Sequence, residues 1–69
     1  MSRVLINYSS IEEMMSLPGV RVKVADKILE MREAKGDLEL EDLSHVPYLR
    51  LTSQLIRCLD FAPFEEGEG

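Results

Sequence analysis

Cysteine is almost absent from this sequence, and its scarcity excludes two kinds of structural support. The single Cys58 cannot form a disulfide within the chain, and one thiol cannot hold a zinc ion. Its neighbours Leu55, Ile56 and Leu59 favour a small core residue over a reactive thiol. We therefore expect an intracellular, reducing location.

Long hydrophobic runs are also missing. The longest purely apolar run near the start of the chain is Val4–Ile6. Such a run is far too short to span a bilayer or to form the core of a signal peptide. We expect a protein that is not embedded in a membrane, and one that forms a domain of a longer protein.

The residues needed for catalysis are few. His45 is the only histidine, and although Asp42 precedes it by one helical turn, no serine or cysteine nucleophile has matching spacing. A chain of 69 residues is one domain whose core is barely large enough to be stable, with little room for a cleft. We expect a surface histidine, no catalytic residue, no metal site and no enzyme.

The local patterns that the sequence does contain are mostly those of helix starts, helix faces and helix ends. Ser10 and Glu13 have the spacing of a capping box, which predicts a helix that ends at Pro18-Gly19. Met14 and Met15 are interpreted as core filler of this helix rather than as a partner-binding patch.

A longer helix is predicted from about residue 21 to residue 35. The residues of its apolar face lie at helical spacing, and they are Val20, Val24, Ala25, Ile28, Leu29 and Met31. Gly36 stands where a helix commonly ends in the left-handed conformation.

The second half predicts two further helices. Glu41 and Asp42 suit the first turn of a short helix that ends before Pro47, and a fourth helix is predicted from about residue 51 to residue 61. The glycine-bearing acidic segment 64–69 is predicted to be disordered. The fold class is therefore all-α, a compact bundle of four to five helices within residues 1–63.

The two halves repeat. Leu17-Pro18-Gly19-Val20-Arg21 corresponds to Val46-Pro47-Tyr48-Leu49-Arg50 at an offset of 29 residues. Each half reads as a short helix, a proline-led turn and a longer helix, in units of about 10–35 and 40–61. Two such units can bury each other's apolar faces, which neither could bury alone.

These residues resemble the tandem helix-hairpin-helix domain of the ComEA-like type. The matching features span residues 6 to 61, and they are Ile6-Asn7, Ser10 with Glu12-Glu13, Leu17 to Val20, Ala25, Ile28, Gly36, Asp42-Leu43 and Val46. The resemblance implies two pseudo-symmetric units and binding to the nucleic-acid backbone without base preference. It also implies that each hairpin turn presents backbone N–H groups to a phosphate and that the first hairpin can hold a monovalent cation.

The hairpin glycines of that pattern are partly lost. Arg21 replaces the second glycine of the first turn, and Tyr48 and Arg50 replace both glycines of the second. A residue other than glycine costs about 1–2 kcal/mol where the backbone must be left-handed. We therefore expect a remodelled second turn. Tyr48 itself has three alternatives: it packs on the core, stacks on a base, or anchors a protein partner.

Charge is divided unevenly along this acidic chain. The formal net charge is −5, yet residues 17–28 and residues 46–58 each carry +2, which leaves −9 for the rest. Basic residues around the turns suit a phosphate-facing surface, and they equally suit an ordinary solvated one. The candidate phosphate-binding residues are Gly19, Val20, Arg21, Val22, Lys23 and Lys27. A weaker or partner-binding second set comprises Tyr48, Leu49, Arg50 and Arg57.

Two functions from different classes remain. The first is a noncatalytic module that binds the backbone of duplex DNA or RNA weakly and without sequence specificity, mainly through the first hairpin. The second is a protein-interaction module that keeps the fold but has lost phosphate binding. No cofactor is expected for either.

Overall fold

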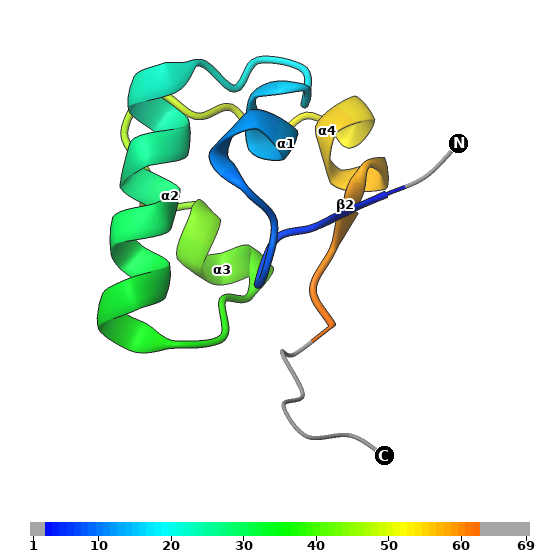
Figure 1. Ribbon diagram of the computed structural model, residues 1–69. Coiled ribbons are helices and arrows are strands. Elements are labelled where there is room, and N and C mark those ends of the chain that lie inside the picture. The colour runs from blue at the N-terminus through cyan, green and yellow to red at the C-terminus, as the bar shows by residue number, and fades with distance from the viewer. Residues whose placement is uncertain (1–2, 63–69) are drawn as a thin grey trace.

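The computed structural model describes residues 3–62, and these residues are mostly helical. The elements in chain order are β1 (Val4–Leu5), α1 (Ile11–Met15), α2 (Val22–Lys35), α3 (Leu40–Leu43), α4 (Ser53–Arg57) and β2 (Leu59–Asp60). α2 runs along one side of the molecule, and α4 and the two strands lie on the other side (Figure 1). α1 and α3 lie between them. The acidic segment 64–69 that we predicted to be disordered lies outside the described residues.

The capping box predicted at the start of α1 is confirmed. The Glu13 N–H donates to the Ser10 hydroxyl (3.2 Å), and the Ser10 N–H donates to the Glu13 carboxylate (2.8 Å). These two bonds satisfy donors that the first turn of a helix otherwise leaves unpaired. Of the two adjacent methionines, Met14 is fully buried as predicted, whereas Met15 is 43% exposed, so its assignment to the core is wrong.

The long helix is also where the sequence placed it. α2 begins at Val22, with Arg21 as its N-cap, and it ends at Lys35. Gly36 follows with φ +99°, and its N–H donates to the Arg32 carbonyl at 2.8 Å. Ile28, at the centre of the predicted apolar face, is 1% exposed.

One continuous core holds the helices together. Its buried apolar residues come from every part of the described chain, and they are Ile6, Met14, Leu17, Val20, Val24, Ala25, Ile28, Leu38, Leu43, Val46, Leu55 and Leu59. Cys58 packs against this core and is partly buried, as its apolar neighbours predicted. Both halves of the sequence therefore supply residues to this one core.

The described residues contain four helices, consistent with the predicted helical bundle, together with one short strand pair that the all-α prediction lacks. β1 and β2 form a parallel pair in which Val4 is opposite Leu59 and Leu5 is opposite Asp60. The Val4 N–H donates to the Cys58 carbonyl (2.8 Å). The fourth helix, expected to reach residue 61, therefore ends at Arg57, because the chain must extend at Leu59 to meet β1.

The side chain of Asn7 joins three distant segments. Its amide nitrogen donates to the carbonyls of Leu38 (3.4 Å), Phe61 (3.3 Å) and Ala62 (3.1 Å), while its oxygen accepts from the Leu38 N–H. Asn7 is 6% exposed, so these bonds are shielded from water. They fix the strand ends against the connection between α2 and α3.

An ion pair links the end of α2 to α3. Lys35 Nζ lies 2.9 Å from the Asp42 carboxylate, which also accepts from the Glu39 N–H at 2.8 Å. The hydrogen bond from Lys35, followed by the one from Glu39, lowers the pKa of Asp42 below its ordinary 3.8. Asp42 is therefore engaged with Lys35, and the exposed His45 is at most a minor electrostatic neighbour.

Replacing Asn7 by alanine should lower the free energy of unfolding by about 1–3 kcal/mol, because the Leu38 N–H would stay buried without an acceptor. Chemical denaturation measures this change. The exposed Gln54→Ala serves as the matched control and should change stability by no more than about 0.5 kcal/mol. An Asn7→Ala protein as stable as the Gln54→Ala protein would contradict the role given to Asn7.

The Asp42 carboxyl should titrate with a midpoint below 3.8 in carbon-detected NMR. Since its pKa is lower in the folded state, the stabilisation it provides is present above pH 3.8 and disappears as the pH falls through the folded-state pKa. Lys35→Met should raise the midpoint, because the largest cause of the shift is removed. Lys23→Met, at the other end of α2, should leave it in place, and equal shifts in both variants would show that net charge alone sets the pKa.

Candidate functional site

The first hairpin, residues 17–21, connects α1 to α2 through a tight turn. The Val20 N–H donates to the Leu17 carbonyl at 3.2 Å, and Gly19 has φ +80°. A Cβ added at Gly19 would meet no atom within 4 Å. The backbone conformation therefore favours glycine at this position, whereas space does not.

The start of α2 immediately follows this turn. Arg21 is the N-cap in an extended conformation (φ −105°), so the glycine lost at this position leaves no left-handed strain. Its side chain accepts no hydrogen bond from the first turn of the helix. A helix start with no side-chain cap exposes N–H groups and carries partial positive charge.

The second hairpin, residues 46–50, keeps the conformation of the first. The Leu49 N–H donates to the Val46 carbonyl at 3.3 Å, and Tyr48 has φ +70°. Tyr48 is the only residue other than glycine with positive φ in the part of the chain that the structure describes. The expectation of a remodelled turn is therefore wrong, because the tyrosine adopts the left-handed conformation that the glycine would have had.

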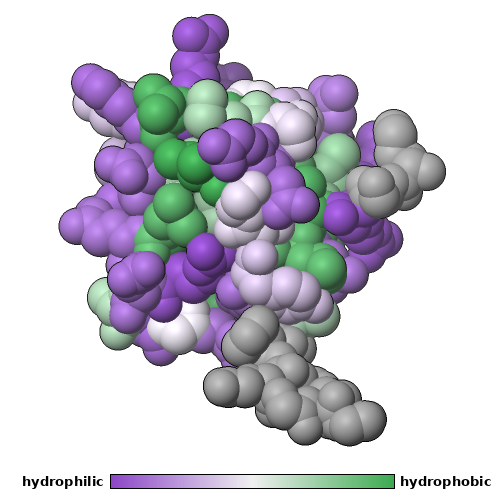
Figure 2. Space-filling view, viewed as in Figure 1, coloured by the Kyte–Doolittle hydropathy of each residue, from purple (hydrophilic) through white to green (hydrophobic). Residues whose placement is uncertain are grey.

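The Tyr48 side chain points into solvent. It is 92% exposed, which rules out the alternative in which it packs on the core. Figure 2 shows apolar side chains over the upper part of α2 and a second group on the side of α4 and the strands, with hydrophilic side chains around both. The exposed large hydrophobic residues are Tyr8, Met15, Val22, Leu40, Tyr48 and Ile56.

The two hairpins meet at one open groove of about 670 Å³. Its lining residues come from both halves of the sequence, and they are Gly19, Arg21, Val22, Lys23, Val24, Lys27, Pro47 and Tyr48. We call this surface the hairpin groove. The lining is mainly apolar, with three basic side chains among it, so the groove combines an aromatic and aliphatic surface with positive charge.

The hairpin groove includes most but not all of the residues predicted from the sequence. Val20 is 5% exposed and belongs to the core, so only its backbone is available. Leu49 is partly buried against the core. Arg50 and Arg57 are exposed but do not line the groove. Pro47 and Val24 line it without having been predicted, because only the folded structure brings them together.

Positive and negative charges separate along α2. Arg21, Lys23 and Lys27 line the hairpin groove, whereas a different hollow on α2 is lined by Leu29 and the acidic side chains of Asp26, Glu30 and Glu33. Lys27 Nζ lies 3.1 Å from Glu30 Oε1, an exposed pair that contributes little to stability. The chain is thus acidic overall while the groove carries positive charge.

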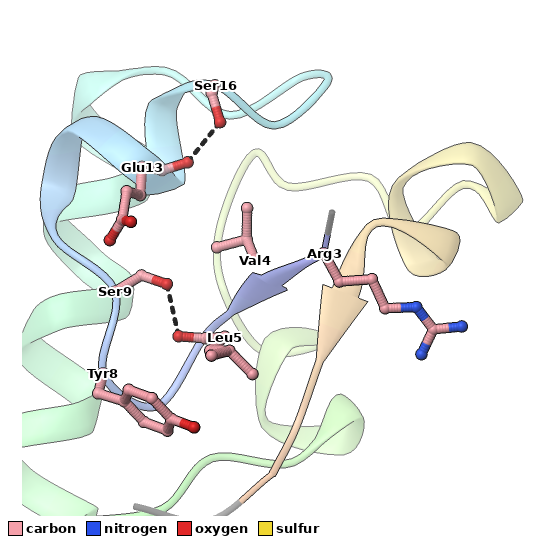
Figure 3. A pocket seen from close by; sticks show the side chains of 7 residues that line it. All are labelled: Arg3, Val4, Leu5, Tyr8, Ser9, Glu13 and Ser16. Carbon is pink, nitrogen blue, oxygen red and sulfur yellow. Dashed lines mark hydrogen bonds between the residues drawn. The ribbon is translucent and has the colours of Figure 1, made fainter. Parts of the chain in front are cut away.

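A second hollow, of about 310 Å³, lies between β1 and α1 (Figure 3). Its hydroxyls are used locally: Ser9 Oγ donates to the Leu5 carbonyl, and Ser16 Oγ donates to the Glu13 carbonyl. Arg3 points away from the other lining side chains (Figure 3). Because its polar groups support the backbone around α1, this hollow is a weaker candidate than the hairpin groove.

The comparison with protein families agrees with the hairpin geometry. A family model described as the helix-hairpin-helix motif matches residues 1–53. The chain belongs to the helix-hairpin-helix family. The match includes both tight turns, at residues 17–21 and 46–50, and ends at the first residue of α4. Neither a curated protein nor a solved structure matches the chain.

Residues 3–62 contain neither a membrane-spanning helix nor a cluster of metal-ligating side chains. No helix in this range combines the length and the apolar character needed to cross a membrane. Within the same residues, histidine, cysteine and acidic side chains do not gather in groups of three or more that could hold a metal ion.

The two left-handed hairpin positions should respond in opposite ways to substitution. Gly19→Ala should lower the free energy of unfolding by about 1–2 kcal/mol, because alanine is strained at positive φ. Tyr48→Gly should leave it unchanged or raise it by up to about 1 kcal/mol, because relief of strain offsets the greater entropy of the unfolded chain. Denaturant melts compare the two variants.

Arg50→Gly is the matched control for Tyr48→Gly. It is an exposed position of the same hairpin whose φ is not positive, so glycine should only destabilise it. If Tyr48→Gly lowered the free energy of unfolding by more than about 1 kcal/mol, the tyrosine ring would stabilise the fold, which would contradict the expectation from its exposed position.

Proposed function

We propose that this protein is a noncatalytic module that binds the sugar-phosphate backbone of DNA or RNA weakly and without base sequence preference. The helix-hairpin-helix motif is in general a motif that binds the nucleic-acid backbone. The observation that carries the proposal is the first hairpin: Gly19, at φ +80°, lies in the turn that leads through Val20 and Arg21 into α2, whose start has no side-chain cap.

The first hairpin offers a phosphate two kinds of donor. The N–H groups at the start of α2, which has no side-chain cap, suit an anion, and glycine keeps side chains away from it. Arg21 stands where the second glycine of the motif is lost, and its guanidinium can contact a phosphate oxygen directly. Lys23 and Lys27 add positive charge along the same groove.

The affinity should be low. The groove presents three basic side chains, and one of them, Lys27, already pairs with Glu30. The chain as a whole carries −5 and repels a polyanion at long range. A Kd of about 10⁻⁴ to 10⁻⁶ M, the range of nonspecific DNA binders, is therefore expected.

We further infer a tandem arrangement of the ComEA-like type. At two helix starts, 29 residues apart, the N-cap N–H donates to the carboxylate three residues later: Ser10 to Glu13 and Glu39 to Asp42. The turn hydrogen bonds of the two hairpins have the same offset. The second unit departs from the first where α4 begins at Ser53 and has only five residues, so its hairpin is the weaker phosphate site.

One observation favours the alternative function, a protein-interaction module. Tyr48 is 92% exposed beside an apolar groove, and exposed aromatic residues are typical anchors of protein interfaces. The basic groove residues would then face an acidic partner. Binding measurements with nucleic acid separate the two functions.

Adding a short duplex at low salt should shift the amide resonances of Gly19, Val20 and Val22 more than those of Leu49 and Leu51. The first hairpin presents the start of a long helix, whereas the second presents a tyrosine. An amide chemical-shift titration measures both the affinity and the residues that respond. Absence of any shift at millimolar duplex would contradict phosphate binding and favour the protein-interaction function.

A matched pair of variants separates local contact from net charge. Arg21→Ala/Lys23→Ala and Arg50→Ala/Arg57→Ala each remove two positive charges, but only the first pair lines the hairpin groove. The first pair should weaken duplex binding strongly and reduce the logarithmic salt slope by roughly 0.9 per lost phosphate contact. An equal effect of the second pair would contradict the assignment of the site to the first hairpin.

A further inference from the structure

We propose that the hairpin groove binds single-stranded nucleic acid in preference to duplex, with an unpaired base stacked on Tyr48 and its neighbouring phosphates held by Arg21 and Lys23. This inference rests on the proposed function and adds the class of nucleic acid. It is argued from the side chains of the groove and from the backbone of Tyr48.

The hairpin groove has an apolar surface that the backbone of a duplex would leave without a contact. Phosphates and sugars require donors and positive charge, which the basic side chains supply. They have no flat apolar surface that would cover Val22, Pro47 and the Tyr48 ring. Val22 is 55% exposed and Tyr48 is 92% exposed, so both are available to a ligand with an apolar face. An unpaired base has such a face directly beside a phosphate.

The position of Tyr48 favours stacking over packing within the protein. The residue sits at the tip of a hairpin with φ +70°, a conformation that is costly for a bulky side chain. The ring is nevertheless exposed to solvent, next to the start of α2, and it adds nothing to the core. Strain at an exposed position is typical of a residue kept for contact with a ligand.

The positive charge of the groove favours an anionic ligand. Arg21, Lys23 and Lys27 give the groove positive charge in a chain of −5, so an anionic ligand fits it better than a neutral peptide. A single strand combines the two features of the groove, since successive phosphates alternate with bases that have exposed faces. An acidic peptide would satisfy the basic residues but would leave the aromatic ring without a stacking partner.

The test compares three polyanions on the full chain. The probes are a single strand of about 12 nucleotides, the same strand annealed to its complement, and poly-glutamate of similar charge. Affinities come from amide shifts and from the quenching of tyrosine fluorescence, in a Tyr8→Phe background so that only Tyr48 emits. The single strand should bind about 5- to 150-fold more tightly than the duplex, the range expected for one stacked base, and should quench Tyr48.

Variants of Tyr48 identify the source of that preference. Tyr48→Phe should keep it, whereas Tyr48→Ala and Tyr48→Gly should reduce single-strand affinity to that of the duplex. The glycine variant relieves the left-handed strain, so it stays folded if the alanine variant does not. Arg21→Ala/Lys23→Ala should weaken both nucleic acids.

The outcomes distinguish this inference from the function on which it rests. Equal affinities for single strand and duplex, unaffected by Tyr48→Gly, would overturn the stacking inference and leave backbone binding in place. Poly-glutamate that bound as tightly as the single strand would likewise overturn it and assign the groove to acidic protein. Failure of both nucleic acids to bind would overturn both proposals.

Discussion

The hydrogen bonds of Asn7 are the interaction on which the arrangement of this small domain depends. One buried side chain contacts the connection after α2 and the segment after β2, and it leaves none of its own polar atoms unpaired. Arg32 reinforces it from α2, since its Nη1 donates to the Ile6 and Ser9 carbonyls, each at 3.0 Å. Together they hold the chain that leads into α1 against α2, and therefore set where the first hairpin lies.

The hairpin groove follows from that arrangement. α1 and α3 each end in a tight turn, and both turns reach the same end of α2, so Gly19 and Tyr48 line one surface although they are 29 residues apart. The first turn contributes a small residue and the start of a helix, and the second contributes an aromatic ring. The groove is thus lined by two turns that have the same hydrogen bond and similar left-handed φ but different side chains, which gives it both charge and an apolar face.

The sequence predicted the elements that depend on neighbouring residues and missed those that depend on distant ones. Ser10 and the α2 periodicity are local signals, and both predictions are confirmed. The end of α4 was misplaced because Leu55 and Leu59 are four residues apart, a spacing that suits one face of a helix and also one face of a strand. Asn7 was noted only as part of a resemblance, since nothing nearby in the sequence reveals partners at positions 38, 61 and 62. The candidate site was predicted in part for the same reason: the repeat located both turns, but their meeting at one groove is a property of the tertiary structure.

The parallel pairing of β1 with β2 has a consequence for the order in which the chain folds. Val4 and Leu59 are opposite each other but 55 positions apart, and each strand has only two residues. Closing so long a loop costs entropy that two residues of pairing offset poorly, whereas α1 and α2 contact each other across a short turn. We therefore expect the helices to assemble first and the strand pair to close last. In the folded protein the outer end of this pair, farthest from Asn7, should open first, so the Val4 amide should exchange with solvent before the amides of the α2 core.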